Sequence, residues 1–247
     1  MNLLVDFGNT RLKWALWDED RRVMGGVFAH ADTSLETALS RNWAALPRAA
    51  GILVASVVNA ELEQQLAALV EEHFDQQAEF VRSPASALGI RNAYADPARL
   101  GVDRFLALAA LHAAKPRAQI LISCGTALTL DALTADGGHL GGLIAPSPGL
   151  MRQALGRATA RVGEASGELV EIADNTVDAA YSGSVLAAVS LIRRFTENVS
   201  ARLGRPSRSP ATAAVSMNAC PCCPISNADA ILSCAVSRCG RGASTNK

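Results

Sequence analysis

The chain has 247 residues, of which 49% are hydrophobic and 19% charged, so it can build one large domain or two smaller ones and is not disordered in composition. Its 23 basic and 23 acidic residues cancel, which argues against nucleic acid as the main partner, because such binding relies on a basic surface. We recognise neither a signal peptide nor an uncharged apolar run of membrane-spanning length, and therefore expect a cytoplasmic protein without membrane contact.

The first half of the chain has the pattern β-β-β-α-β-α-β. Two short strands are joined at Gly8-Asn9, a pair that tolerates positive φ and favours a tight turn. Residues 51–58 are apolar and β-branched, as is typical of a strand buried on both faces, and Asn59 is placed to cap the helix after it. The predicted elements are strands 3–6, 11–17 and 25–27, helix 34–45, strand 51–58, helix 60–74 and strand 79–81.

The second half repeats this theme after a strongly apolar helix at 104–114. Its predicted elements are a hairpin of strands 120–123 and 127–133, a strand at 140–144, and helices at 148–156 and 176–203. The alternation of strands and helices predicts an α/β fold with a mixed sheet in each half. We expect an N-terminal lobe at residues 1–115 and a C-terminal lobe at residues 116–205.

The composition changes at about Pro206. Residues 206–247 are rich in Ser, Ala, Pro, Asn and Cys and show no period, and five of the six cysteines lie between Cys220 and Cys239. The spacing of these cysteines does not match a typical zinc site. We expect a poorly ordered tail, and an altered reading frame in the gene would produce a segment of the same kind.

Two similar hairpins begin at Asp6 and at Ser123, one in each half. In both, an apolar strand ends in a short polar residue and a glycine-centred turn rich in hydroxyl and amide groups. Asp6 at a strand end can orient hydrated Mg²⁺, Gly8 lets the backbone approach a ligand, and Asn9 and Thr10 supply donors to phosphate. An ordinary structural hairpin is the competing interpretation, and the second copy favours phosphate binding for both.

Two further motifs carry candidate chemistry. Asp103 and Arg104 stand directly before an apolar helix, where an acid and an arginine can combine a general base with an anion clamp. The alternative is that Asp103 is an ordinary helix cap and Arg104 a surface residue. Residues 137–149 contain several glycines and two prolines, which indicates close backbone packing or a close ligand approach, and His139 among them is more typical of a structural residue than of a catalytic one.

Together these motifs resemble the type III pantothenate kinases, members of the acetate and sugar kinase, Hsc70 and actin superfamily. The resemblance covers residues 1 to about 203. It rests on Asp6-Phe7-Gly8-Asn9-Thr10 with Lys13, Tyr94, Gly101-Val102-Asp103-Arg104, Gly125-Thr126-Ala127 with Thr129 and Asp131, Gly141-Gly142-Leu143-Ile144-Ala145-Pro146 with Gly149, and Asn175-Thr176 with Ala179 and Gly183.

This resemblance implies two RNase H-like (actin-like ATPase) lobes, with mixed sheets flanked by helices and a cleft between them. It implies ATP-dependent phosphorylation of pantothenate to 4'-phosphopantothenate, the first step of coenzyme A biosynthesis. It also implies Mg²⁺, a monovalent cation such as K⁺ or NH₄⁺, and a homodimer whose partner helps to complete the pantothenate site.

The same resemblance assigns roles by position. Asp103 is the expected general base, and Asp6 is expected to hold Mg²⁺ through water. Ser123 stands at the monovalent-cation position, where the family has an aspartate. The expected ATP-binding residues are Asp6, Phe7, Gly8, Asn9, Thr10, Arg11, Leu12, Lys13 and, from the other lobe, Thr126. The expected pantothenate-binding residues are Tyr94, Gly101, Val102, Asp103, Arg104 and Thr176.

Two other functions stay open. One is a catalytically impaired kinase-like protein that acts as a regulatory accessory factor. The neutral Ser123 and the tail favour it, and the intact Asp6, Asp103 and Arg104 oppose it. The other is a different small-molecule kinase of the superfamily, which Tyr94 and the motif at residues 101–104 oppose because they match the pantothenate pocket. The family also ends in further strands of the second lobe, and nothing after Pro206 resembles them, so we expect an exposed sheet edge.

Overall fold

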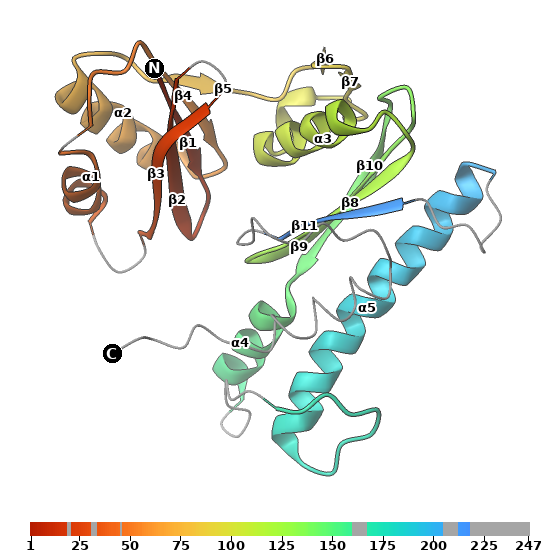
Figure 1. Ribbon diagram of the computed structural model, residues 1–247. Helices are drawn as coiled ribbons and strands as arrows, with labels where there is room; N and C mark the ends of the chain where they lie inside the picture. Colours follow the sequence, from red (N-terminus) through yellow and green to blue (C-terminus); the bar gives the residue numbers. More distant parts are fainter. Residues whose placement is uncertain (19–20, 31–33, 45, 160–166, 205–211, 218–247) are drawn as a thin grey trace. The chain divides into compact units, whose positions relative to one another are not determined.

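The computed structural model describes residues 1–18, 21–30, 34–44, 46–159, 167–204 and 212–217, the last of these as backbone only (Figure 1). The chain divides into two compact units. The first comprises Met1–Ala85 and Tyr94–Leu106, and the second comprises Ser86–Ala93 and Ala107–Lys247. Within the described ranges, no helix is long and apolar enough to cross a membrane.

The first unit is built on a five-stranded mixed sheet in the order β3-β2-β1-β4-β5. The strand β1 pairs antiparallel with β2 and parallel with β4, so its end lies in the middle of the sheet. The strands are β1 (Asn2–Phe7), β2 (Arg11–Asp18), β3 (Arg21–Ala29), β4 (Gly51–Ser56) and β5 (Glu79–Val81).

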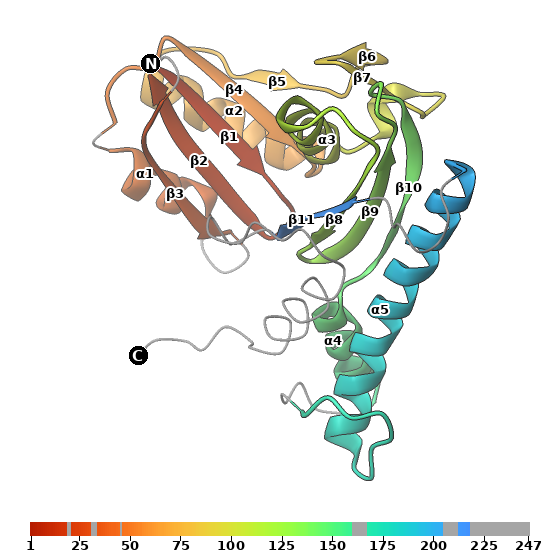
Figure 2. The same ribbon diagram turned by 45° about the vertical axis from the view of Figure 1, so that its right-hand side comes forward.

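Helices α1 (Leu35–Trp43) and α2 (Ala60–Phe74) cover one face of this sheet (Figure 2). Alternate residues of β1 and β2 point into that face, because side chains in a strand alternate between its two sides. The predicted cap is confirmed: the Asn59 side chain accepts a hydrogen bond from the Leu62 N–H at 3.0 Å. The core formed between helices and sheet contains Leu3, Val5, Phe7, Leu12, Trp14, Leu16, Leu39, Trp43, Leu66, Val70 and Phe74.

The second unit has a four-stranded sheet in the order β10-β9-β8-β11. Strands β8 (Gln119–Cys124), β9 (Ala127–Leu133) and β10 (His139–Pro146) form an antiparallel meander. Helix α4 (Pro148–Ala158) follows β10, and the long helix α5 (Thr176–Arg202) packs Ala188 and Val199 against apolar side chains of β8 and β9.

One strand was not expected from the sequence. The backbone of β11 (Thr212–Met217) pairs in parallel with β8, so the expectation of an exposed sheet edge here is wrong. This pairing covers the edge of β8. Residues 205–211 and 218–247, with the cysteines from Cys220 onward, lie outside the described residues.

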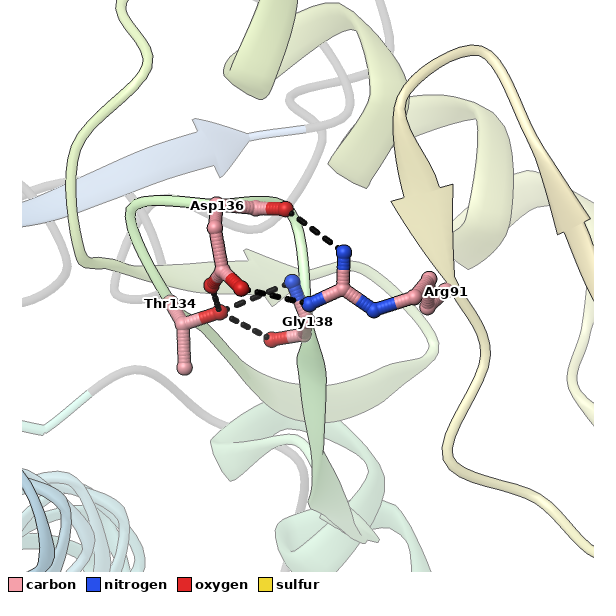
Figure 3. A network of polar contacts seen from close by, with 4 residues as sticks. All are labelled: Arg91, Thr134, Asp136 and Gly138. Atoms are coloured by element: carbon pink, nitrogen blue, oxygen red, sulfur yellow. Dashed lines mark hydrogen bonds and ion pairs between the residues drawn. The ribbon is translucent and has the colours of Figure 1, made fainter.

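A short hairpin of β6 (Ser86–Ala87) and β7 (Ile90–Arg91) is hydrogen-bonded to the turn between β9 and β10 (Figure 3). Arg91 donates from Nη1 to the Asp136 carbonyl at 3.0 Å and from Nη2 to the Asp136 carboxylate at 2.6 Å. The Arg91 backbone N–H also donates to the Gly137 carbonyl at 2.9 Å. Thr134 bonds both to Asp136 and to Gly138, which closes the turn.

The predicted order of elements is confirmed in both halves. Helix α3 (Val102–Ala114) begins two residues earlier than expected, because the Phe105 N–H already donates to the Gly101 carbonyl. The short 3₁₀ helix at Pro97–Arg99 and the β6–β7 hairpin have no periodic pattern and were not predicted.

Candidate active site

The turn of the first hairpin is closed by a hydrogen bond from the Gly8 N–H to the Arg11 carbonyl at 3.1 Å. Neither Gly8 nor Asn9 has a positive φ. The expectation that this turn uses the pair for its tolerance of positive φ is therefore wrong. Glycine serves here for close approach instead, since a Cβ at Gly8 would lie 3.3 Å from the Arg11 carbonyl oxygen. The turn therefore packs tightly while Asn9, Thr10 and Arg11 stay exposed.

Asp6 lies directly opposite Lys13 on the paired strand, and such residues point to the same face of the sheet. The Lys13 Nζ is 2.9 Å from the Asp6 carboxylate, and the Asp6 side chain is 44% exposed. The carboxylate is therefore reachable for a hydrated cation. Phe7 and Leu12 point into the core with no exposed surface, so only their backbone groups can face a nucleotide.

Asp103 lies inside the first turn of α3 and not at its cap position. Its Oδ1 accepts a hydrogen bond from the Arg104 N–H at 2.8 Å. Gly101 makes room for this carboxylate, because a Cβ at Gly101 would be 2.6 Å from the same Oδ1. Burial raises the pKa of Asp103 above its ordinary value, and the negative charge of Asp6 raises it further. The expected base and the expected cation ligand are therefore near enough to interact electrostatically.

Arg104 is a buried residue with 6% exposure, so the alternative that it is a surface side chain is wrong. Its Nη1 donates to the Tyr94 hydroxyl at 3.4 Å. Val102 is buried in the core and can shape a pocket only through its backbone. The first unit thus brings Asp6, Asp103, Arg104 and Tyr94 into one polar cluster.

The remaining expected site residues belong to the second unit. Ser123 and Thr126 flank the turn at Gly125, whose N–H donates to the Ala127 carbonyl at 2.9 Å. This turn is one residue shorter than the first, since Cys124 pairs with Leu128 whereas Phe7 pairs with Leu12. Thr126 is exposed, and Ser123 is half-buried.

Thr176 is the first residue of α5 and is exposed. The cap before it is well formed: the Asn175 Oδ1 accepts from the Asp178 N–H at 3.0 Å, and the Asn175 amide donates to the Asp178 carboxylate at 2.7 Å. The hydrogen bond from the Asn175 amide, and after it the one from the Glu168 N–H at 2.7 Å, lower the pKa of the Asp178 carboxyl. The helix start that carries Thr176 is thereby fixed.

His139 has the structural role that the sequence favoured. Its Nε2 is 3.0 Å from the Asp131 carboxylate, and neither side chain has exposed surface. The Nδ1 accepts from the Ala93 N–H at 3.5 Å, so Nε2 is the nitrogen that donates to Asp131. Sequence reasoning missed this pairing, although both residues lie on adjacent strands of one hairpin.

In the part of the chain that the structure describes, no three histidine, cysteine or acidic side chains gather as ligands for a metal ion. Sequence reasoning also overlooked His30, which contacts the first turn and for which no motif gave a signal.

Each unit thus carries a mixed sheet and a hairpin with a polar, glycine-centred turn, the arrangement of the actin-like and sugar kinase class of fold. Two solved structures support this class. A protein from Sinorhizobium meliloti assigned as a 2-dehydro-3-deoxygalactonokinase matches with a TM-score of 0.52 and 16% identity, over 100% of this chain and 98% of its own. A protein from Campylobacter jejuni assigned as a Baf family transcriptional activator matches with a TM-score of 0.51 and 17% identity, over 78% of both chains.

The sequence comparisons are more specific. The model of the type III pantothenate kinase family matches residues 2–198. A type III pantothenate kinase of Xanthomonas oryzae pv. oryzae is 43% identical over 205 residues, 83% of this chain and 82% of the relative. One from Nitrosococcus oceani is 36% identical over 211 residues, 82% of this chain and 79% of the relative. The chain belongs to the type III pantothenate kinase family, which confirms the resemblance seen in its motifs.

Proposed function

We propose that this chain transfers the γ-phosphoryl group of ATP to pantothenate, giving 4'-phosphopantothenate in the first step of coenzyme A biosynthesis. Family membership supports the reaction. The observation that carries it in the structure is the cluster of Asp6, Asp103, Arg104 and Tyr94 within one compact unit. It combines a cation-binding carboxylate, a base and an anion-binding arginine.

Asp103 is the proposed general base. A primary alcohol is a poor nucleophile, and a carboxylate within hydrogen-bond reach can take its proton as the bond to phosphorus forms. The raised pKa of Asp103 makes this carboxylate a stronger base than an ordinary aspartate. Its hydrogen bond from the Arg104 N–H fixes one oxygen and leaves the other for the substrate hydroxyl.

Arg104, Tyr94, Gly101 and Val102 are the proposed pantothenate-binding residues of the first unit. The substrate carries a carboxylate, and a buried arginine is suited to bind such an anion because its guanidinium is always charged and held in place. Tyr94 contacts this guanidinium and can fix its orientation. Thr176 is added to the pocket on its position in the family motif.

The segment from Asp6 to Lys13 is the proposed phosphate-binding turn, and Thr126 is added on its position in the family motif. Asp6 fits Mg²⁺, because its carboxylate is accessible and Mg²⁺ usually keeps several waters and takes one or two carboxylates. Bound Mg²⁺ would neutralise charge on the phosphates. Lys13 brings a second positive charge to the same place.

The monovalent cation of the family is a different case. Ser123 and the opposite Thr129 offer neutral hydroxyl oxygens, whereas the family has a carboxylate at the position of Ser123. These residues do not fit a tightly held K⁺ or NH₄⁺, and we assign no step of the reaction to that cation. The assay described below measures whether K⁺ changes the rate of phosphorylation.

A homodimer and a cytoplasmic location complete the proposal. The homodimer is carried over from the family, and four exposed apolar side chains on three successive elements of the second unit are candidates for its interface. They are Leu143 and Ile144 on β10, Leu155 on α4 and Val177 on α5. The cytoplasmic location rests on the sequence alone.

The test is ATP-dependent formation of phosphopantothenate by the purified chain, with and without K⁺, beside its Asp103→Asn variant. Turnover by the unmodified chain that the variant lacks supports the kinase. Binding of ATP without transfer would contradict it and indicate a binding or accessory role. Transfer to another alcohol but not to pantothenate would indicate a different kinase of the same fold.

A further inference from the structure

His30 follows β3 and lies against the phosphate-binding turn of the first hairpin. Its Nε2 is 2.8 Å from the Gly8 carbonyl oxygen. Because a carbonyl oxygen only accepts hydrogen bonds, Nε2 is the donor. The ring also meets the fully buried Phe7 edge-on, with centroids 5.2 Å apart, and the His30 N–H donates to the Thr10 carbonyl at 3.4 Å. Two contacts therefore fix the imidazole on this turn, and a backbone hydrogen bond fixes the residue that carries it.

The hydrogen bond to Gly8 determines the direction of the next backbone donor. The peptide bond between Gly8 and Asn9 is planar and trans, so its C=O and N–H point in opposite directions. When His30 holds the Gly8 oxygen, the Asn9 N–H is turned away from the imidazole. Asn9 is exposed, and within the described ranges this N–H has no hydrogen-bond partner. An oriented and unused backbone N–H of this kind suits a phosphate oxygen.

We propose that His30 is a positioning residue for nucleotide binding: it clamps the Gly8 carbonyl and so presents the Asn9 N–H to a phosphate of ATP. This inference rests on the proposed kinase function. His30 lies outside the phosphate-binding segment but sets the geometry of the backbone of that segment. A preorganised donor binds an anion more strongly than one that must be ordered on binding.

Two roles of the imidazole must be separated, the hydrogen bond to Gly8 and the ring contact with Phe7. The variant His30→Phe keeps an aromatic ring beside Phe7 and removes the donor. The variant His30→Gln loses the ring and keeps an N–H donor at a similar distance from the backbone. If the hydrogen bond matters, the glutamine variant keeps its nucleotide affinity and the phenylalanine variant binds nucleotide more weakly. If only packing matters, the phenylalanine variant keeps its affinity and the glutamine variant binds more weakly.

The experiment measures kcat, the KM for ATP and the KM for pantothenate in the three proteins, together with the Kd of ADP by calorimetry. We expect His30→Phe to raise the KM for ATP and the Kd of ADP about tenfold, the size of one hydrogen bond to a charged group. The KM for pantothenate should stay unchanged, and His30→Gln should resemble the unmodified chain.

An unchanged KM for ATP and Kd of ADP in His30→Phe would overturn the inference, and so would a larger loss in His30→Gln than in His30→Phe. These outcomes differ from failure of the proposed function. An unmodified chain that binds ADP without phosphorylating pantothenate would refute the kinase, while the Kd values would still decide the role of His30. A chain that binds no nucleotide would refute both.

Discussion

Ser123 lies directly opposite Thr129 across β8 and β9, at the place where the first hairpin sets Asp6 opposite Lys13. The first pair is an ion pair at 2.9 Å. The second consists of two neutral hydroxyls, and among the described residues the Thr129 Oγ1 is buried without a hydrogen-bond partner. A buried hydroxyl without a partner is unfavourable, so the second hairpin lacks both a charge and a made hydrogen bond at this position.

The variant Ser123→Asp should supply both. A carboxylate opposite Thr129 can accept from its hydroxyl and adds the negative charge that a monovalent cation needs. We expect K⁺ to stimulate phosphorylation in this variant by about tenfold more than in the unmodified chain, the size of one charge-assisted interaction. The matched control is Ser123→Asn, which has a similar shape without the charge. Equal K⁺ stimulation in the aspartate and asparagine variants would contradict this explanation.

Replacing the proposed base should separate chemistry from nucleotide binding. The variant Asp103→Asn keeps the size of the side chain and an oxygen for the Arg104 N–H, but it cannot take a proton. We expect kcat to fall by about 10²- to 10⁴-fold, the usual contribution of a general base. The Kd of ADP should change little. A variant with unchanged turnover would remove Asp103 from the mechanism.

The raised pKa of Asp103 predicts a pH dependence. The base works only when deprotonated, so kcat/KM should fall as the pH drops through a pKa above the usual aspartate range. The variant Asp6→Asn removes a nearby negative charge and should therefore lower the pKa of Asp103. A carboxyl titration by NMR of both proteins measures this shift without requiring activity. A pKa that stays the same in Asp6→Asn would show that burial alone raises it.

Local patterns were enough to predict much of the fold. The cap at Asn59, the apolar run at residues 51–58 and both hairpins follow from rules of sequence over a few neighbouring residues. The strand β11 does not, because its pairing with β8 supplies what its own pattern lacks. The burial of Arg104 is likewise decided by packing between distant segments. The sequence alone therefore did not exclude a surface position for this residue.

The same limit applies to the candidate site. The motifs named Asp6 and Asp103, but the effect of one charge on the pKa of the other needs their spatial arrangement. His30 stands outside every motif, and only the folding of β3 beside β2 brings it to Gly8. Residues that act through the backbone of a neighbour leave little trace in a single sequence.

The buried pair of Asp131 and His139 should contribute strongly to stability. The variant His139→Leu leaves a carboxylate in the core without its main partner, and removing one member of a buried pair costs about 3–5 kcal/mol. Replacing both residues with leucine should restore part of that loss, because no buried charge then remains. Urea unfolding of His139→Leu, Asp131→Leu and the double variant measures the coupling between the two side chains. Strictly additive losses would mean that the two side chains do not stabilise each other.

The ion pair between Arg91 and Asp136 should contribute far less to the stability of the fold than its short distance suggests. Thr134 and then Arg91 lower the pKa of Asp136 to about 2, so this carboxylate is charged at any working pH. Both side chains are largely exposed, however, and water and salt screen exposed ion pairs so that they contribute little to stability. We therefore expect Arg91→Ala to lower the free energy of unfolding only slightly.

The neighbouring Gly137→Ala should be much more harmful than Arg91→Ala. Gly137 has a φ of +80°, and an added methyl group would overlap the Gly89 carbonyl (Figure 3 shows the turn). Strain and overlap together should cost about 3 kcal/mol or more. The matched control is Gly183→Ala, since a Cβ there meets no atom within 4 Å. If urea unfolding gave Gly137→Ala and Arg91→Ala similar losses, the exposed ion pair, and not the backbone contact, would hold the β6–β7 hairpin to this turn.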